Sequence, residues 1–131
     1  MPIPAPNLYP DFNIVRLSHV ELKVTDLAWS RGFYVDTLGL QVTHEDSETI
    51  YLRALEERGH HCMTLRKATE PGVGVLGFKV WDDPDLDRAE AWFKARGLPT
   101  AWIDRPYMGR VLSARDPFGV PLEFYAKMDR L

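Results

Sequence analysis

The residues of this chain that are best suited to chemistry are a histidine near its start and a carboxylate near its end. His19 lies in the alternating segment 17–24, and Glu123 lies in the middle of the segment 121–127. Alternation of apolar and polar residues predicts a strand in both places. An imidazole and a carboxylate on facing strands could hold a divalent metal.

Ferrous oxygen chemistry requires a larger ligand set than this pair. Two histidines and one carboxylate bind the iron and leave open positions for substrate and O₂. An internal repeat, described below, places Val75 where the second histidine would stand. Loss of an outer-shell partner already lowers metal affinity about 10- to 100-fold, so a missing ligand should lower it at least as much. The alternatives are that His19 is hydrogen-bonded among polar strand residues and that Glu123 is salt-bridged inside a concave sheet.

Two further candidates lie next to each other. His60 and His61 fall on a predicted strand over about residues 60–66, where neighbours point to opposite faces and cannot share one metal. We expect them to be surface histidines at the entry to the strand. Cys62 lies in an apolar pattern that predicts a packed thiol. It is the single cysteine, which excludes an intrachain disulfide and favours a reducing cytoplasm.

The elements that must position these residues occur twice in the sequence. Each copy contains a strand, a helix that ends at a glycine (Gly39 or Gly97) and three further strands. A repeat of this length implies one supersecondary unit that is used twice. The matched segments are 24–27 with 80–83, 50–54 with 110–114, and 61–65 with 121–125.

Each predicted helix has a start signal and an apolar face. Asp26 is the expected N-cap of a helix over about residues 27–38, and Asp83 is the expected N-cap of the second helix, with Pro84 at its first position. The expected apolar faces are Leu27, Phe33, Tyr34 and Leu38 in the first helix, and Leu86, Ala89 and Phe93 in the second.

The predicted fold class is α+β, with two tandem βαβββ modules that pair into a curved mixed sheet. We expect a proline-rich arm at residues 1–14 and a single domain at 15–131, with modules at about 15–69 and 73–128. The polar strand faces would line a shared concavity, with the helices outside. The start of the first strand and the middle of the last should face this concavity in each module, and these positions hold His19, Met63, Val75 and Glu123.

Bulk composition limits the partners. The chain has 131 residues, of which 45% are apolar and 27% charged, as expected of one globular domain. Its formal net charge of −3 lacks the basic excess typical of proteins that bind nucleic acid or anionic membranes. No segment approaches the roughly 20 apolar residues of a membrane-spanning helix.

The ordered set of motifs resembles the vicinal oxygen chelate (glyoxalase/bleomycin resistance/dioxygenase) superfamily. Within it, the chain is similar to the amino-terminal domain of type I extradiol dioxygenases, of the homoprotocatechuate (3,4-dihydroxyphenylacetate) and catechol 2,3-dioxygenase families. The segments that carry the likeness are 18–27, 33–40, 50–54, 56–61, 70–80 and 116–125.

The resemblance implies a division of labour between two domains. Dioxygenases of this group are longer, and they bind Fe(II), or alternatively Mn(II), and the catechol in their carboxy-terminal domain. This chain would then be the non-metal amino-terminal domain, without catalytic or cofactor-binding residues, and His19 and Glu123 would be vestigial ligands. Its expected role is structural, and its expected partners are the catalytic domain of the same protein and further copies in a homo-oligomer. On its own the chain is expected to be inactive.

Two other functions remain open from the sequence. The chain could be a free-standing small metalloenzyme of the same superfamily that uses His19 and Glu123 as ligands. It could also be a non-catalytic protein that binds an aromatic ligand, like the antibiotic-resistance members of the superfamily.

Overall fold

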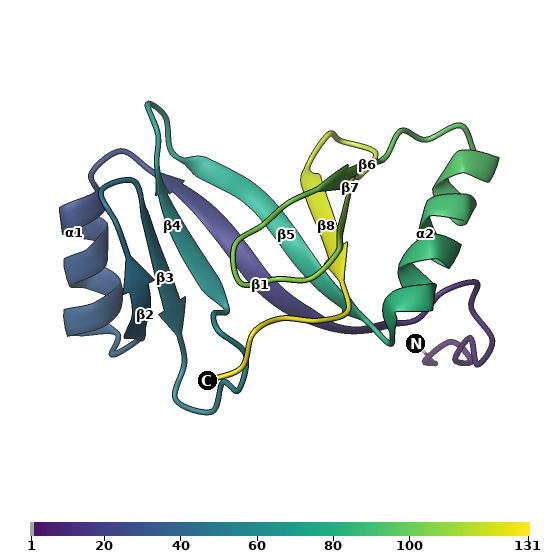
Figure 1. Cartoon of the computed structure of the whole chain (residues 1–131), viewed down its shortest axis with the longest axis horizontal. Helices are drawn as coiled ribbons and strands as arrows, with labels where there is room; N and C mark the ends of the chain where they lie inside the picture. The colour runs from purple at the N-terminus through teal and green to yellow at the C-terminus, as the bar shows by residue number, and fades with distance from the viewer. Residues whose placement is uncertain (1) are drawn as a thin grey trace.

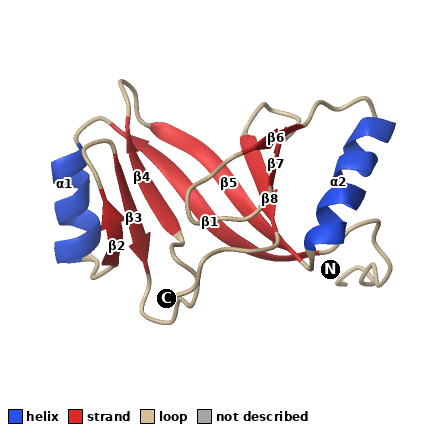
Figure 2. Cartoon of the chain, viewed as in Figure 1, coloured by secondary structure: helices blue, strands red, loops and turns tan. Residues whose placement is uncertain are grey.

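The fold is one curved, eight-stranded mixed sheet with a helix near each end (Figures 1 and 2). A computed structural model describes residues 2–131. The strands lie in the order β2-β3-β4-β1-β5-β8-β7-β6. The elements are β1 (Ile14–Val24), α1 (Leu27–Arg31), the π-helical segment η1 (Gly32–Thr37), β2 (Gln41–Glu45), β3 (Thr49–Arg53), β4 (Met63–Lys67), β5 (Gly72–Val80), α2 (Asp83–Ala95), β6 (Ala101–Ile103), β7 (Val111–Arg115) and β8 (Pro121–Tyr125).

The two predicted modules meet at the centre of the sheet. β1 and β5 are antiparallel, with His19 opposite Gly77 and Glu21 opposite Val75. Each of these strands is also parallel to the last strand of its own module, β1 to β4 and β5 to β8. Parallel neighbours need a crossover connection, which the helix and the two intervening strands of each module supply. The predicted α+β fold of two βαβββ modules is therefore confirmed.

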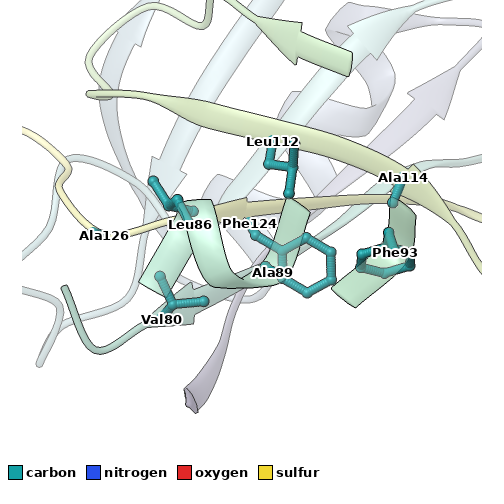
Figure 3. Packing of buried hydrophobic residues seen from close by; sticks show 8 residues of the cluster. All are labelled: Val80, Leu86, Ala89, Phe93, Leu112, Ala114, Phe124 and Ala126. Atoms are coloured by element: carbon teal, nitrogen blue, oxygen red, sulfur yellow. The ribbon is translucent and has the colours of Figure 1, made fainter. Parts of the chain in front are cut away.

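Each module packs its helix against one face of the sheet. In the second module, Leu86, Ala89 and Phe93 of α2 pack against the sheet, as the sequence pattern predicted. Figure 3 shows this cluster, in which the helix residues meet Val80, Leu112, Ala114, Phe124 and Ala126. The first module has a smaller cluster around Ile50, Leu52 and Leu65. The polar residues of the strands lie on the opposite face of the sheet.

The predicted position of Met63 in the concavity is wrong. Its side chain packs with the apolar cluster of the first module, beside Leu65. The concave face of β4 is formed by Thr64 and Arg66 instead. β4 begins at Met63 rather than near residue 60, and a shift of one residue moves every side chain of a strand to the other face.

The first helix departs from its predicted regular form. Its N-cap is Asp26, as expected, and the Oδ1 atom of Asp26 accepts a hydrogen bond from the Trp29 N–H at 3.0 Å. After Arg31, however, the chain continues as the π-helical segment η1. The wider π turn changes which residues face the sheet. Phe33 and Leu38 are therefore 47% and 57% exposed, although the helical pattern predicted both on the buried face.

The N-cap of α2 is Asp82 rather than the expected Asp83. The Asp85 N–H donates a hydrogen bond to Oδ1 of Asp82 at 3.0 Å. Pro84 has no N–H, and it fits within the first turn because the N–H groups of that turn make no intrahelical hydrogen bonds. Asp83 lies inside the helix and its carboxylate pairs with Lys127 at 3.0 Å. Neither this 13-residue helix nor any other helix in residues 2–131 is long and apolar enough to cross a bilayer.

A buried carboxylate ties the segment before β1 to α2. The Asp85 side chain is 1% exposed. Its Oδ1 accepts from Arg88 at 2.7 Å and its Oδ2 accepts from the Asn13 N–H at 3.1 Å. Phe12, the preceding residue, packs edge-on against Trp92. These contacts fix residues 12 and 13 on the second module, and the predicted boundary between arm and domain stays a prediction.

Replacing this carboxylate should destabilise the domain. In Asp85→Ala, the Asn13 N–H loses its acceptor, so we expect the free energy of unfolding to fall by about 2 kcal/mol or more. Asp87→Ala is the matched control, because the Asp87 carboxylate is 61% exposed and pairs with Arg110 at the surface. That change should cost at most about 1 kcal/mol. Urea unfolding measures both, and equal losses would contradict the anchoring role of Asp85.

Candidate functional site

The concave face of the sheet is largely filled by side chains. Residues from both modules and from the loop after β6 converge on it, and the remaining space is about 20 Å³. A volume of this size holds roughly one water molecule. The residues that line it are His19, Glu21, Tyr51, His61, Thr64, Arg66, Val75, Arg105, Pro106, Met108 and Glu123.

His19 and Glu123 meet at the centre of this face, as the repeat predicted. Nε2 of His19 lies 2.5 Å from Oε1 of Glu123, and both side chains are at most 3% exposed. Because a carboxylate only accepts hydrogen bonds, Nε2 of His19 carries the proton and donates. Nδ1 of His19 is buried without a hydrogen-bond partner in residues 2–131. The geometry matches the alternative in which His19 is hydrogen-bonded among polar strand residues.

The second oxygen of Glu123 is bound by an arginine that the sequence pattern did not single out. Nε of Arg105 donates to Oε2 at 3.0 Å. Burial alone raises the pKa of Glu123, but the hydrogen bonds and charges of His19 and Arg105 outweigh it and lower the pKa below its usual value. Glu123 is therefore an anion at neutral pH, salt-bridged as the second alternative proposed. Arg105 lies in a loop, outside any periodic segment, so no sequence signal pointed to it.

Two glycines of β5 make room for the polar side chains of β1. A Cβ atom at Gly77 would overlap the imidazole of His19, and one at Gly74 would overlap the carboxylate of Glu21. The His19 ring therefore lies against the backbone of β5. Glu21 is paired in the same way as Glu123, with Nε of Arg66 at 2.6 Å from its Oε1. Each of these two concave carboxylates thus has its own arginine.

The expectation of surface histidines at the entry to β4 is wrong. His60 and His61 are 8% and 4% exposed. They precede β4 in irregular backbone, where the strand alternation does not apply, and their Nδ1 atoms lie 3.0 Å apart. One must donate and the other accept. The His60 ring stacks on Tyr107 at 3.7 Å, and the His61 ring meets His19 edge-on at 5.5 Å.

The titration of His61 follows from this placement. Burial is the largest cause that lowers its pKa, and the neighbouring His19 and His60 lower it further, to about 3. His61 is therefore neutral at physiological pH. Cys62 beside it is a half-buried free thiol whose pKa is raised mainly by burial, which fits the predicted packed, unreactive thiol.

The donor set differs from that of a metal centre. Nε2 of His19 is hydrogen-bonded to Oε1 of Glu123, so the nitrogen that would bind an ion carries a proton instead. The third position is the apolar Val75. Within residues 2–131, no three His, Cys, Asp or Glu side chains are grouped so that they could hold an ion.

Comparison with known proteins places this geometry in a family. Residues 16–124 match the Glyoxalase/Bleomycin resistance protein/Dioxygenase superfamily. A metapyrocatechase of Geobacillus stearothermophilus is 29% identical over 121 residues, which cover 92% of the chain and 37% of the relative. A manganese-dependent 2,3-dihydroxybiphenyl 1,2-dioxygenase of Geobacillus genomosp. 3 is 26% identical over 120 residues, covering 89% of the chain and 38% of the relative.

Solved structures agree with the sequence relatives. Homoprotocatechuate 2,3-dioxygenase from Arthrobacter globiformis superposes with a TM-score of 0.89 at 40% identity, covering 95% of this chain and 40% of that one. The chain thus spans less than half the length of these relatives and corresponds to their amino-terminal part. Because the family match runs from β1 to β8, this chain belongs to the Glyoxalase/Bleomycin resistance protein/Dioxygenase superfamily.

Proposed function

We propose that this chain is the amino-terminal, non-metal domain of an extradiol ring-cleavage dioxygenase and that its role there is structural. The observation that carries the proposal is how little space the side chains leave in the concavity. Both oxygens of Glu123 are engaged, one by His19 and one by Arg105, and about 20 Å³ remains around them. A catechol is many times larger than one water molecule and does not fit such a space.

The proposed parent enzyme inserts both atoms of O₂ into a catechol such as 3,4-dihydroxyphenylacetate, next to its two hydroxyl groups. Two relatives named as catechol-cleaving enzymes support this substrate class. The metal, Fe(II) or Mn(II), would be held by the carboxy-terminal domain, and one relative named as manganese-dependent supports the second choice. The single cysteine, Cys62, is a free thiol and supports a cytoplasmic location.

A structural role needs surfaces that contact other domains or subunits. Large aromatic side chains are enriched at such interfaces. Four of them are more than 70% exposed here. They are Tyr9 before β1, Trp29 in α1, Trp81 after β5 and Phe118 in the turn before β8, at 92%, 78%, 71% and 94%. We propose that the catalytic domain of the same protein and further copies of it cover part of this surface in a homo-oligomer.

The two other functions that the sequence left open have less support. A free-standing metalloenzyme would have to separate Nε2 of His19 from Glu123 and displace Arg105 from the same carboxylate. An aromatic-ligand binder that uses this concavity would have to open a space that now holds about one water. Both would lose buried, charge-assisted hydrogen bonds, which are among the strongest in a protein.

The isolated chain should neither bind ferrous ion at this pair nor cleave catechols. We expect anaerobic calorimetric titration with Fe(II) to give the same result for the wild type and for His19→Gln, because His19 is already engaged by Glu123. Assay with 3,4-dihydroxyphenylacetate and O₂ should give no ring-cleaved product. His44→Gln is the control for exposed histidines. About one ion per chain that is lost in His19→Gln and kept in His44→Gln would overturn the proposal.

The close approach of His19 to β5 predicts a selective effect of added volume. Gly77→Ala should lower the free energy of unfolding by about 1–3 kcal/mol, because the new Cβ atom forces the imidazole away from Glu123. Gly32→Ala makes the same chemical change in a helical, open position. It should leave stability unchanged or raise it by up to about 1 kcal/mol. Equal stability of Gly77→Ala and wild type in urea unfolding would show that the ring does not occupy this place.

The neutral His61 predicts acid sensitivity. Its folded pKa of about 3 lies below the unfolded value of about 6.5, so below about pH 6.5 the unfolded state binds a proton that the folded state does not. The free energy of unfolding should therefore fall with decreasing pH, with a contribution of about 1.4 kcal/mol per pH unit below about pH 6. In urea unfolding, His61→Gln should lose this contribution and His44→Gln should keep it. An unchanged slope in His61→Gln would contradict the buried neutral state.

A further inference from the structure

A second, open pocket lies on the concave face of the sheet, towards the start of β1 from the His19–Glu123 pair. This pocket has a volume of about 250 Å³, compared with about 20 Å³ around the pair. Its floor includes Tyr125, which is buried and whose hydroxyl is hydrogen-bonded to Ser18. The Tyr125 ring also lies 5.5 Å from the His19 ring. Tyr125 thus separates the filled part of the concavity from the open part.

The open pocket is strongly basic in a chain whose formal net charge is −3. A single carboxylate, that of Glu57, lines it, together with five cationic side chains. The cationic residues are Arg16, Arg58, Lys79, Lys127 and Arg130. They come from β1, from β5, from the loop after β3 and from the segment that follows β8 (Figure 1), so four separate parts of the chain bring positive charge to one place.

Most of this positive charge is not neutralised within residues 2–131. The Glu57 carboxylate pairs with Arg16 at 3.2 Å, and Lys127 pairs with Asp83 outside the pocket at 3.0 Å. In the part of the chain that the structure describes, Arg58, Lys79 and Arg130 form no ion pair with a carboxylate. The filled part of the concavity differs, because there Glu21 and Glu123 are each paired with an arginine.

Two of the cations are brought together by the register of the sheet, although one of them, Arg16, also pairs with Glu57. Arg16 of β1 and Lys79 of β5 are directly opposite each other in the central antiparallel pair. Like charges in this arrangement destabilise a sheet. Lys79 is also half-buried, which adds a desolvation cost to its charge. An anion in the pocket would relieve both effects, because it would lie against both positive charges.

We propose that this pocket binds a small anion with carboxylate or phosphate groups. Guanidinium groups bind both kinds of oxygen acceptor bidentately, and an ammonium group adds a point charge. The space of about 250 Å³ is more than ten times that around the His19–Glu123 pair, so it suits a polyvalent ligand of several heavy atoms better than a single halide ion. The site does not depend on the proposed role in ring cleavage, because within residues 2–131 none of its cationic residues is hydrogen-bonded to His19 or Glu123.

Titration calorimetry with two probes tests the proposal and separates the two ligand chemistries. Citrate represents the polycarboxylates and pyrophosphate represents the phosphates, and sodium chloride at matched ionic strength is the reference. We expect at least one probe to bind saturably, with about one molecule per chain. Because a hydrogen bond to a charged group is lost, Lys79→Gln and Arg130→Gln should each weaken binding about tenfold or more. Lys67→Gln, at the exposed end of β4, should retain the wild-type affinity.

A second measurement does not require the natural ligand. Without any added anion, Lys79→Gln should melt at a higher temperature than the wild type, because the repulsion with Arg16 is removed. The anion probe should then raise the melting temperature of the wild type and of Lys67→Gln more than that of Lys79→Gln. The proposal is wrong if neither probe binds more tightly than chloride, or if Lys79→Gln and Arg130→Gln bind the probes as the wild type does.

Discussion

The carboxylate of Glu123, shared between His19 and Arg105, is the interaction on which the interior of this domain depends. A buried charge is costly unless its hydrogen-bonding capacity is met, and here each oxygen has a donor from a different part of the chain. The pairing draws the loop after β6 over the concave face and holds the imidazole against β5, where Gly77 leaves space for it. The nearly filled concavity follows from these contacts.

The concave face of the sheet thus has two parts with different properties. Near the middle of β1 and β8, the concave face is filled by paired charges and by the buried His61. Towards the start of β1, it remains open and positively charged. The segment after β8 crosses from the second module to the first (Figure 1), where the His60 N–H donates to the Asp129 carbonyl at 2.8 Å. That crossing joins the modules a second time and forms one wall of the open pocket.

Periodicity predicted the parts of the structure that regular backbone controls. The repeat gave the two modules, and strand alternation together with the repeat brought His19, Val75 and Glu123 to one face. Prediction failed where the backbone is irregular. The loop before β4 is longer than expected, so Met63 faces the core and His60 and His61 are buried. The π-helical η1 exposes Phe33. Arg105 lies in a loop, whose sequence has no regular alternation from which its position could be predicted.

Nuclear magnetic resonance of the His19 imidazole in ¹⁵N-labelled protein, during titration with Mn(II), tests most directly whether this pair is closed to metal. If Glu123 holds the ring as described, Nε2 carries a slowly exchanging proton, and the His19 resonances stay as sharp as before when the paramagnetic ion is added. Selective broadening of the His19 resonances at low Mn(II), with loss of the Nε2 proton, would contradict the closed pair and make His19 a metal ligand.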